Sequence, residues 1–547
     1  MSIIFSVGLS GLNAAQNALN TTSNNISNVY TPGYNRELTI LGQSRADAGV
    51  QVNDIQRQFN QYVASQLNAS TSASSALRTY GNQISQIDNL LADREAGLAP
   101  LMQNFFSSLE DLASAPSDPA ARQGVLGTAN TLTAQFRAFD GYLQDMQEGI
   151  NGQIRDEVTQ INNTTEQLAT LNREIALARA RSGDAPNTLL NQRDQLVHEL
   201  SERMDIRLNI QDGKSYNISL PNGQPLVSGT NHYRLEAMDS PNDPQRSVLG
   251  YRDSSGNTVA LAEDTIKGGT LGGLMTFRSE SLDKTQNQIG QLAVSLAVGF
   301  NEQHRMGIDL DGELGEDFFN IGDPQAYSSG RNSGTAEVAS ASFDRANIDQ
   351  LRATDYTVRF TDSGPQVIRK DNGQALPADE VNWADNELSF GGITLTFTDA
   401  PEDGDRFEVQ PVRRASANFD AQIADLDKIA AAAPDADGNF TGTGDNRNAL
   451  ALQNLQSKAL VGGRASFSQA YAGMISDVGN QTNIVQVNLD ARQGLTDQLK
   501  AVQQSESGVN LDEEAANLIR YQQFYMANAR VIDTASSLFD TILGLRN

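Results

Sequence analysis

The chain is 547 residues long, which is enough for roughly two to four domains with buried cores. Its net charge of −27 argues against binding to nucleic acid or to an anionic membrane surface, because both partners need clusters of lysine and arginine. The sequence has no cysteine, which excludes disulfides, thiolate metal sites and cysteine nucleophiles.

Targeting signals of the common kinds are not found in the sequence. No apolar run approaches the ~18 residues that a membrane-spanning helix needs, so we expect no membrane insertion. Residues 1–6 lack the basic segment and the small-residue cleavage site of a secretory signal. We therefore expect a cytoplasmic chain, or one that is exported by a route without a cleaved signal.

Apolar side chains recur through residues 5–30 in alternating steps of 4 and 3, which is the repeat of a coiled coil. A helix with such a narrow stripe needs a partner stripe to bury it. Its predicted contact residues are Phe5, Leu9, Leu12, Leu19, Ile26 and Tyr30. A turn follows, because Pro32 fixes its own φ and Gly33 permits a positive φ. We include Pro32, Gly33 and Tyr34 in the candidate interface.

The next part of the chain is predicted to be helical. Residues 55–95 carry apolar side chains at helical spacing, and a longer helical stretch follows the break at 116–119 and continues to residue 175. Polar, turn-prone residues at 182–187 interrupt it, and residues 189–200 resume the helical period. Two helices joined by a short turn predict an antiparallel helical hairpin.

The middle of the chain alternates between strand and helix patterns. Apolar alternation predicts strands at 206–210 and 216–220, with turns at Asp212-Gly213 and Asn222-Gly223. Further short strands are expected at 230–262, then a helix from 274 to about 304. A second strand-rich block, 335–412, holds the only tryptophan, Trp383, and from residue 419 the chain is expected to be mostly helical to its end.

The C-terminal helix repeats the heptad of the N-terminal one. A capping box predicts its start, since Asn510 can accept from the amide three residues on while Glu513 reaches back. Its predicted contact residues are Leu511, Leu518, Tyr525, Ile532, Phe539 and Leu543. One such helix alone fits an ordinary terminal helix. Two matching helices at opposite ends predict that the ends pair with each other or with neighbouring copies.

Candidate catalytic or metal-binding chemistry is sparse. The histidines, His198, His232 and His304, lie apart, so we expect surface or half-buried residues rather than a zinc site. Residues 309–313 are similar to the start of a calcium loop but lack its later ligands, which favours a polar turn. The glycine-rich residues 268–273 lack the lysine of a phosphate loop and predict a flexible lead-in to a helix. We expect no catalytic, cofactor-binding or metal-binding residues and no enzyme activity.

These patterns predict an α+β protein, in which N- and C-terminal regions form a discontinuous helical coiled-coil stalk with inserted antiparallel β modules. We expect a terminal coiled-coil assembly domain from residues 1–45 and 508–547. Residues 46–334 and 413–507 should form a helical-bundle domain with β-hairpins near 205–265, and residues 335–412 an inserted β-rich outer domain.

Both ends of the chain resemble the axial proteins of the bacterial flagellum, the family of the rod and hook proteins. The matching segments are SGLNAA at 10–15, NNISN at 24–28, TPGYNR at 31–36, GVNLDEEAANL at 508–518 and YQQ at 521–523. Interior segments are similar to those of the members that form the hook–filament junction. They are LNQRDQL at 190–196, NGQPLV at 222–227, GGTLGGLMTF at 268–277, FNEQH at 300–304 and GIDL at 307–310. Asn35 stands where the family pattern has serine.

The resemblance implies a structural subunit that is exported unfolded through the flagellar type III apparatus and joins the hook to the filament outside the cell. It implies self-association in a ring, contacts with the hook protein and a second hook–filament junction protein, and a cytoplasmic export chaperone at the C-terminal helix. Relatives of this kind keep their terminal segments disordered as monomers and fold them on assembly.

Two alternatives stay open at this point. The chain could be the hook protein or another axial or junction subunit, although the interior segments and the long helical hairpin argue against the hook protein. A secreted enzyme displayed on the flagellum, with its activity in residues 335–412, is the alternative of a different class. That block has no histidine and no catalytic spacing.

Overall fold

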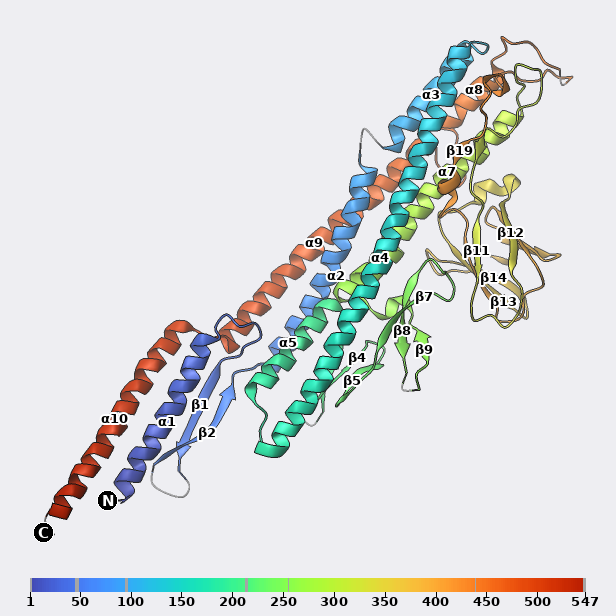
Figure 1. Cartoon of the computed structure of the whole chain (residues 1–547). Coiled ribbons are helices and arrows are strands. Elements are labelled where there is room, and N and C mark those ends of the chain that lie inside the picture. The colour runs from blue at the N-terminus through green and yellow to red at the C-terminus, as the bar shows by residue number, and fades with distance from the viewer. Residues whose placement is uncertain are drawn as a thin grey trace.

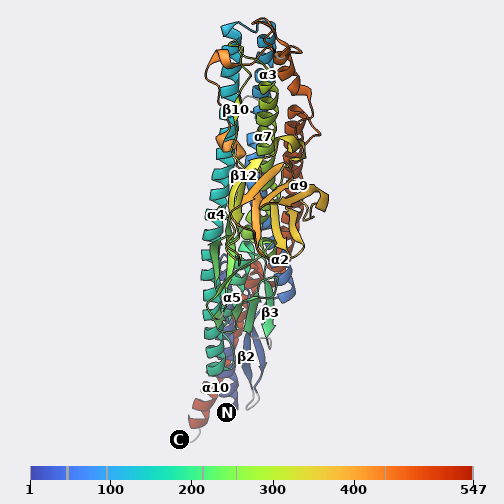
Figure 2. The ribbon, with the colours of Figure 1, turned by 90° about the vertical axis from the view of Figure 1, so that its right-hand side faces the viewer.

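The computed structural model describes residues 2–44, 49–93, 97–211, 215–253, 255–437 and 439–544. The molecule is long and narrow, and both ends of the chain lie at the same tip (Figure 1, Figure 2). Three parts follow one another: a terminal unit that holds both chain ends, a helical stalk, and an outer β module on one flank of the stalk (Figure 1).

The terminal unit consists of two helices and a β-hairpin. Helix α1 (Ser2–Ser27) lies beside α10 (Leu511–Gly544), and strands β1 (Glu37–Gln43) and β2 (Val50–Arg57) pack against α1. The hairpin is a correction to the sequence prediction, which placed no strand here and began a helix near residue 55. The resemblance implied disordered terminal segments, whereas both are continuous helices in this structure.

The stalk is a bundle of helices built around α4. Its helices are α2 (Gln61–Leu91), α3 (Leu98–Ser114), α4 (Pro119–Ser182), α5 (Asn187–Arg203), α6 (Gly269–Phe277), α7 (Asp283–Arg305), α8 (Arg447–Asn454) and α9 (Phe467–Ser507). The predicted hairpin of α4 and α5 is confirmed, and the apolar residues that predicted it, such as Ile150, Ile154 and Ile161, are fully buried. Asp118 starts α4 by accepting from the amide of Ala120 at 3.1 Å.

Two small antiparallel sheets pack against α4, beside the helical hairpin of α4 and α5. The first has strand order β3-β4-β5-β6 and the second β7-β8-β9. Their bounds are Arg207–Gln211, Ser215–Ser219, Pro225–Ser228, Asn231–His232, Leu235–Asp239, Ser247–Arg252 and Thr258–Ala260. The predicted strands at 206–220 are confirmed, and so is the turn at Asn222-Gly223, where Gly223 has φ 93°. The predicted turn at Asp212-Gly213 lies outside the described residues.

The glycine-rich segment is part of a helix rather than a flexible lead-in, because α6 already begins at Gly269. A Cβ on Gly273 would lie 2.4 Å from the carbonyl oxygen of Ala76 in α2, and one on Gly272 would lie 2.3 Å from the backbone of Lys267. The glycines therefore allow α6 to pack closely on its neighbours.

The outer module is a sandwich of two four-stranded antiparallel sheets, with orders β11-β18-β13-β14 and β12-β17-β16-β15. The strands are β11 (Gln325–Ser328), β12 (Val338–Phe343), β13 (Tyr356–Thr361), β14 (Gly364–Arg369), β15 (Val381–Ala384), β16 (Glu387–Phe390), β17 (Ile393–Phe397) and β18 (Arg406–Gln410). The strand-rich character is as predicted, but β11 precedes the expected start at residue 335 and pairs with β18.

The segment after residue 419 corrects the expectation of a mostly helical C-terminal part. In the described residues of 419–446, the regular elements are short: a 3₁₀ turn (Leu426–Lys428), a bridge from Ala432 to Ile308, and strand β19 (Asp420–Ala421), which pairs with β10 (Phe319–Asn320). Pro434, Gly442 and Gly444 explain the irregular backbone, since all three disfavour a helix interior. This segment closes the end of the stalk that lies farthest from the chain termini (Figure 1).

Candidate assembly interface

Helices α1 and α10 approach closely because the facing stripe of α1 is made of small residues. The buried stripe is Gly8, Gly11, Ala15, Ala18, Thr22 and Asn25, again in alternating steps of 3 and 4. A Cβ on Gly8 would lie 2.8 Å from Ile532 Cγ1, and one on Gly11 would lie 2.2 Å from Asn528 Oδ1. The heptad that pairs the two ends is therefore carried by small side chains on α1, not by its large apolar ones.

A buried group of polar residues joins the two ends at the base of this pair. Asn25 donates to Glu514 Oε2 at 3.2 Å and to the carbonyl of Glu37 at 2.9 Å. Its Oδ1 accepts from the Tyr34 hydroxyl at 2.8 Å. Arg36 Nε lies 2.8 Å from Glu514 Oε1. We call Asn25, Tyr34, Arg36 and Glu514 the polar lock.

Burial sets the chemistry of the polar lock. The Glu514 side chain is only 1% exposed, so its charge depends on Arg36 and Asn25 for compensation. Burial, and then the nearby charges of Glu37 and Glu514, raise the pKa of Tyr34 well above its usual value. Tyr34 therefore stays protonated and keeps donating to Asn25 at any physiological pH.

Of the two reciprocal contacts in the predicted capping box of the C-terminal helix, only the one made by the Asn510 side chain is present. Asn510 Oδ1 accepts from the amide of Asp512 at 3.0 Å and from that of Glu513 at 3.4 Å. The Glu513 side chain instead pairs with Arg36 Nη1 at 2.7 Å. The expected reach of Glu513 back to the cap is thus corrected, and the residue reinforces the contact between the ends.

The large seam residues predicted on α1 lie on other faces of that helix than its small-residue stripe. Phe5, Leu9, Tyr30, Leu511, Phe539 and Leu543 are exposed, whereas Leu12, Leu19, Ile26, Leu518, Tyr525 and Ile532 are half-buried. Of these, Ile532 lies against Gly8. The structure does not bring the large apolar residues of the two seams together face to face, because the small stripe of α1 already faces α10.

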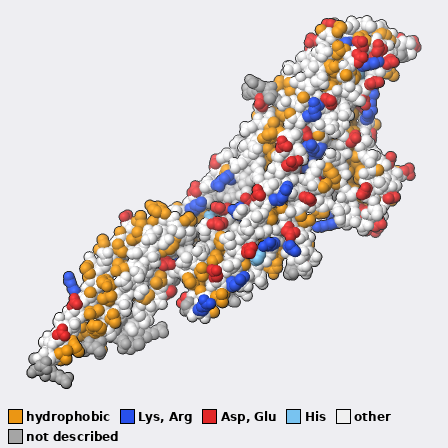
Figure 3. Space-filling view, in the orientation of Figure 1, with side chains coloured by type: hydrophobic (Ala, Val, Ile, Leu, Met, Phe, Trp, Pro, Cys, Tyr) orange, Lys and Arg blue, Asp and Glu red, His pale blue; other side chains and the backbone are white. Residues whose placement is uncertain are grey.

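The terminal unit consequently exposes a large apolar surface. Figure 3 shows hydrophobic side chains gathered over the α1 and α10 pair at the lower left. Further exposed apolar residues of α10 are Ile519, Phe524, Met526, Val531, Leu538 and Ile542. A contiguous apolar patch that is exposed to solvent is typical of a protein–protein interaction site.

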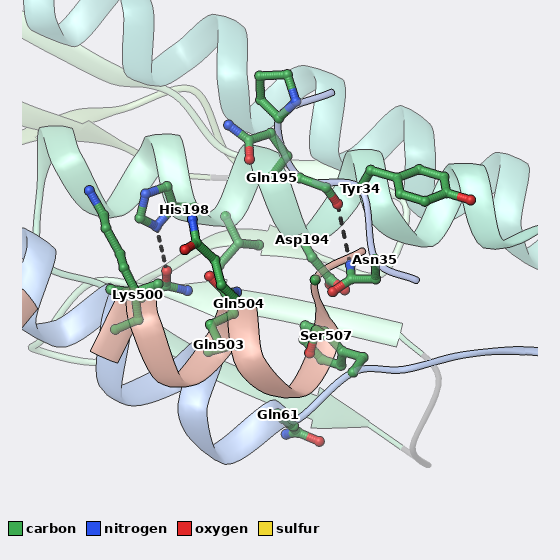
Figure 4. A pocket seen from close by; sticks show the side chains of 18 of the residues that line it. Tyr34, Asn35, Gln61, Asp194, Gln195, His198, Lys500, Gln503, Gln504 and Ser507 are labelled. Atoms are coloured by element: carbon green, nitrogen blue, oxygen red, sulfur yellow. Dashed lines mark hydrogen bonds between the residues drawn. The ribbon is translucent and has the colours of Figure 1, made fainter. Parts of the chain in front are cut away.

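Polar contacts join the terminal unit to the stalk. Asn35 donates to Asn191 of α5 at 2.8 Å, and Arg57 pairs with Asp194 of the same helix at 2.7 Å. A cavity of about 560 Å³ lies between the turn at 29–35, α5 and the end of α9 (Figure 4). Gly33, with φ 74°, forms part of its wall, where a Cβ would lie 2.9 Å from Gln195.

Pro32, Gly33 and Tyr34 thus have different positions from those of the seam residues. Pro32 and Gly33 are exposed at the rim of this cavity, and Tyr34 is half-buried in the polar lock. Sequence reasoning missed Gly8, Gly11 and Glu514 as interface residues. The period of small residues in α1 is the signal that could have found the two glycines.

One histidine is placed differently from expectation, since His304 is fully buried in the stalk. Its Nδ1–H donates to the carbonyl of Glu316 at 2.7 Å, and its Nε2 accepts from the amide of Ala430 at 2.9 Å. Burial lowers the pKa of His304 to about 4, so the ring is neutral at pH 7. It is a structural link to the irregular segment after residue 419.

The polar turn predicted at 309–313 is confirmed, and an ammonium group occupies its centre. Asp309 Oδ1 accepts from the amides of Asp311 and Glu313. Lys428 Nζ lies 3.1 Å from Asp309, 3.1 Å from Asp311 and 2.7 Å from Glu313. Within the described ranges no group of three or more histidine or acidic residues is arranged to hold a metal ion.

Among the helices that the structure describes, none is both long and apolar enough to cross a bilayer.

Four family descriptions match successive segments of the chain. "Flagella basal body rod protein" matches residues 5–35, and "Flagellar basal body rod FlgEFG protein C-terminal" matches 503–545. Between them, "Flagellar hook-associated protein FlgK helical domain" matches 84–319, and "Flagellar hook-associated protein 1, D2-like domain" matches 327–411.

Whole proteins and a solved structure are similar over most of the chain. The flagellar hook-associated protein 1 of Salmonella typhimurium is 41% identical over 560 residues, covering 100% of both chains. That of Escherichia coli strain K12 is 41% identical over 556 residues, with the same coverage. The flagellar hook junction protein FlgK of Burkholderia pseudomallei superposes with a TM-score of 0.75 at 27% identity, covering 80% of this chain and 99% of that one.

Proposed function

The chain belongs to the flagellar hook-associated protein 1 family, and from this premise we propose that its copies assemble through the exposed apolar faces of their terminal helices. It is an exported, extracellular structural subunit of the bacterial flagellum, and it forms the junction between hook and filament.

The observation that carries the proposal is the apolar surface left over when α1 and α10 pair. The small stripe of α1 is covered by α10, whereas Phe5 and Leu9 remain 47% and 46% exposed. On α10, Phe539 and Leu543 are 53% and 48% exposed. Large apolar side chains that one chain cannot bury are the expected contacts of a subunit with its neighbours.

Burying these apolar side chains between subunits can supply enough free energy for the subunits to associate. Fully burying one large apolar side chain is worth about 1.5–3 kcal/mol. Several exposed side chains on each terminal helix can offset the entropy that an associating subunit loses, which is roughly 4–15 kcal/mol.

A closed ring of like-oriented copies is the assembly that this arrangement favours. Each terminal pair has apolar residues on more than one side, so it can contact a neighbour on each side. The subunit associates with hook and filament components, and we assign the two ends of the ring to the hook protein and to a second hook–filament junction protein.

Before export, the apolar side chains of the C-terminal helix have to be shielded from water. We propose that a cytoplasmic export chaperone holds the C-terminal helix through Leu518, Tyr525 and Ile532, which are half-buried in this structure. An amphipathic helix in a hydrophobic groove is the recognition mode that this pattern fits. We assign no catalytic role to the chain.

The test replaces one exposed seam residue at a time. Leu9→Asp and Phe539→Asp put a charge on side chains that are exposed in the single chain, so the stalk and the outer module should stay folded. We expect both variants to be secreted but absent from the junction, leaving hooks without filaments. The matched control is Tyr142→Asp, since Tyr142 is 40% exposed on α4 in the stalk. Normal filaments on cells that carry either seam variant would contradict the proposal.

The alternatives are separated by simple observations. A purified chain that forms long tubes unaided would favour a hook-protein role over a junction role. Turnover of a peptide or glycan substrate by the isolated protein would favour a displayed enzyme in the outer module.

A further inference from the structure

A groove on the surface of the stalk lies between α2, α6 and α9. It has a volume of about 450 Å³, and most of its lining is small or apolar, from residues such as Ala73, Ala76, Leu77, Gly273 and Ala491. The lining residues that carry a charge are Lys267, which precedes α6, and Arg492 of α9, and both are basic. We call this surface the basic groove.

The described part of the chain leaves the cations of the basic groove without a carboxylate partner. Within those residues, the side chains of Lys267 and Arg492 make no hydrogen bond and no ion pair, and the polar contacts at both positions are made by backbone atoms. Arg78, next to the groove on α2, donates to the amide oxygen of Gln493 at 2.7 Å. In a chain of net charge −27, an apolar groove bordered by three such cations favours an acidic partner.

The acidic residues of α9 near the groove are held by other groups. Asp490 and Asp497 accept from glutamine side chains of the same helix, at 2.9 and 3.0 Å. Val487 and Leu495 are 61% and 41% exposed on α9 and extend the apolar surface beside the groove. The surface offered to a partner is therefore apolar with a basic border.

The outer face of α4 carries the opposite charge. Between residues 145 and 166 the acidic residues are Asp145, Glu148, Asp156, Glu157 and Glu166, and the basic residue is Arg155. Glu157 is used within the chain, since it pairs with Arg203 of α5 at 2.9 Å. Asp156 is exposed, and Glu166 lies 3.5 Å from Arg234 in a pair of which both members are more than half exposed. Such a surface pair contributes little, so both carboxylates can accept a better partner.

This face of α4 is also shaped for close approach by another helix. Its residues recur in alternating steps of 3 and 4 and are Gly149, Gly152, Asp156, Thr159, Asn163 and Glu166. A Cβ on Gly149 or Gly152 would meet no atom within 4 Å, so the fold of the single chain does not require glycine at either position. We call these six residues the α4 face.

The basic groove and the α4 face lie on opposite sides of the stalk. Figure 2 shows α4 along one edge of the stalk and α9 along the other. Helix α2 packs against α9 and α6, and α4 packs against α5 and α6, so a layer of helices separates α4 from α9. The two surfaces therefore cannot meet within one chain, and each is open to a different neighbour.

Both surfaces lie at the same height along the stalk. Gln83 of α2 donates to Gln153 of α4 at 3.5 Å, and the two helices run in opposite directions (Figure 1). Ala76 of the groove precedes Gln83 by seven residues, which places it level with about residue 160 of α4. That position is inside the α4 face. Copies that share one height in a ring can therefore bring the two surfaces together.

We propose that the basic groove of one copy is the docking surface for the α4 face of the neighbouring copy. In this contact Glu166 faces Arg492 and Lys267, and Asp156 faces Arg78. The proposal rests on the proposed function, in which like-oriented copies form a closed ring. Such a ring joins two different patches of each subunit, one to each neighbour, and complementary charge selects the pairing. The stalks are then held side by side in addition to the terminal units.

A cysteine pair tests the contact directly, because the natural sequence has no cysteine. One chain would carry both Glu166→Cys and Arg492→Cys, so that each copy can be joined to both of its neighbours. Isolated flagella would be treated with a short thiol crosslinker and then denatured. We expect a ladder of multiples of 59.0 kDa, which is lost when either cysteine is omitted.

The matched control moves one cysteine to another face of the stalk at the same height. Val259→Cys replaces Glu166→Cys and keeps the same partner. Val259 is 48% exposed in β9, which pairs with β8 and through it with β7. The carbonyl of Leu235 in β7 accepts from Asn162 of α4 at 2.8 Å, which fixes the height of this sheet. We expect no ladder from the control chain.

Charge reversal gives a second measurement that needs no crosslinker. Asp156→Arg together with Glu166→Arg places cations against Arg78 and Arg492 of the neighbour. Cells that carry only this chain should lose the filaments from most hooks, because like charges then face each other across the contact. Adding Arg78→Glu and Arg492→Glu to the same chain restores opposite charges and should restore the filaments.

Three results would overturn the docking proposal. The first is the absence of a ladder from flagella that contain the chain with both cysteines, which leaves the proposed function intact because the chain has been incorporated. A crosslinked dimer from Arg492→Cys alone is the second, since it would show that two α9 helices meet. The third is a chain with all four reversed charges that is folded and secreted but does not restore filaments.

Discussion

The amide of Asn25 in α1 donates to the carboxylate of Glu514 at the start of α10, across 3.2 Å of space and 489 positions of sequence. The same carboxylate pairs with Arg36, so both ends of the chain and the turn between α1 and β1 meet at one buried anion. A buried charge that needs specific partners can fix the register in which two helices pack, because other registers would leave the charge unpaired.

Replacing this anion should loosen the two chain ends. Glu514→Gln keeps the shape of the side chain but removes its charge, which leaves Arg36 without its most buried partner. We expect the α1 and α10 pair to lose about 1–3 kcal/mol of stability. Amide hydrogen exchange within residues 2–27 and 511–544 should rise, while exchange in the stalk stays unchanged. Glu513→Gln is the control, since Glu513 is 57% exposed and its pair with Arg36 should contribute less than about 1 kcal/mol.

Limited proteolysis of the purified chain should remove the terminal unit first. The contacts between this unit and α5 are polar and surround a cavity, whereas the stalk has a continuous apolar core. We expect early cleavage within residues 1–57 and 511–547 and a stable fragment near 58–507, identified by mass. Protection of the ends to the same degree as the stalk would show that the pair is equally stable in the single chain.

The buried His304 predicts a loss of stability in mild acid. Its folded-state pKa of about 4 lies below the ordinary value of 6.5, so the unfolded chain binds the proton more strongly. The contribution of His304 to folding is complete above pH 6.5 and is lost as the pH falls to about 4. By linkage this loss is about 3 kcal/mol.

The measurement for His304 is urea unfolding at pH 7 and at pH 4.5. His304→Gln should show a smaller difference between the two pH values than the natural chain. His232→Gln serves as the control, because His232 lies in a short strand and is not fully buried. An unchanged pH difference in His304→Gln would mean that other groups cause the acid sensitivity.

Two glycine-to-alanine substitutions should change the free energy of unfolding in opposite directions. Gly273→Ala would place its Cβ 2.4 Å from the carbonyl oxygen of Ala76, so α6 and α2 must separate, at a cost of about 1–3 kcal/mol. Gly149→Ala in α4 meets no atom within 4 Å and should stabilise the chain by about 0.5–1 kcal/mol. Chemical denaturation of both variants measures the difference, and equal effects would contradict the close packing of α6.

Periodic segments were predictable from the sequence because their pattern is local. The long α4, its return in α5 and the strands around Asn222-Gly223 all follow from repeats of apolar residues and from turn residues. Prediction failed where the pattern was weak or short. The hairpin of β1 and β2 exposes apolar residues such as Ile40 and Ile55, so it shows little of the alternation that marks a half-buried strand.

Some residues of the candidate interface were predictable from the sequence, and others were not. The heptads predicted a helix at each end of the chain, and the structure leaves the predicted contact residues Phe5, Leu9, Phe539 and Leu543 exposed. On α1, the residues that face the partner helix within the chain were missed, whereas Ile532 of α10 was predicted and lies against Gly8. Gly8 and Gly11 contribute through the space they leave, which only the position of Asn528 and Ile532 reveals.

Local periodicity and short segments of characteristic residues were enough to predict most helices of the stalk, a helix at each end of the chain and the family of the chain. Which stripe of α1 faces α10, and which apolar side chains stay exposed, became visible from the tertiary structure alone. The physical reason is that two stripes on one helix compete for one partner. The smaller residues allow the closer approach of backbones, and the buried contact between Asn25 and Glu514 then excludes the alternative.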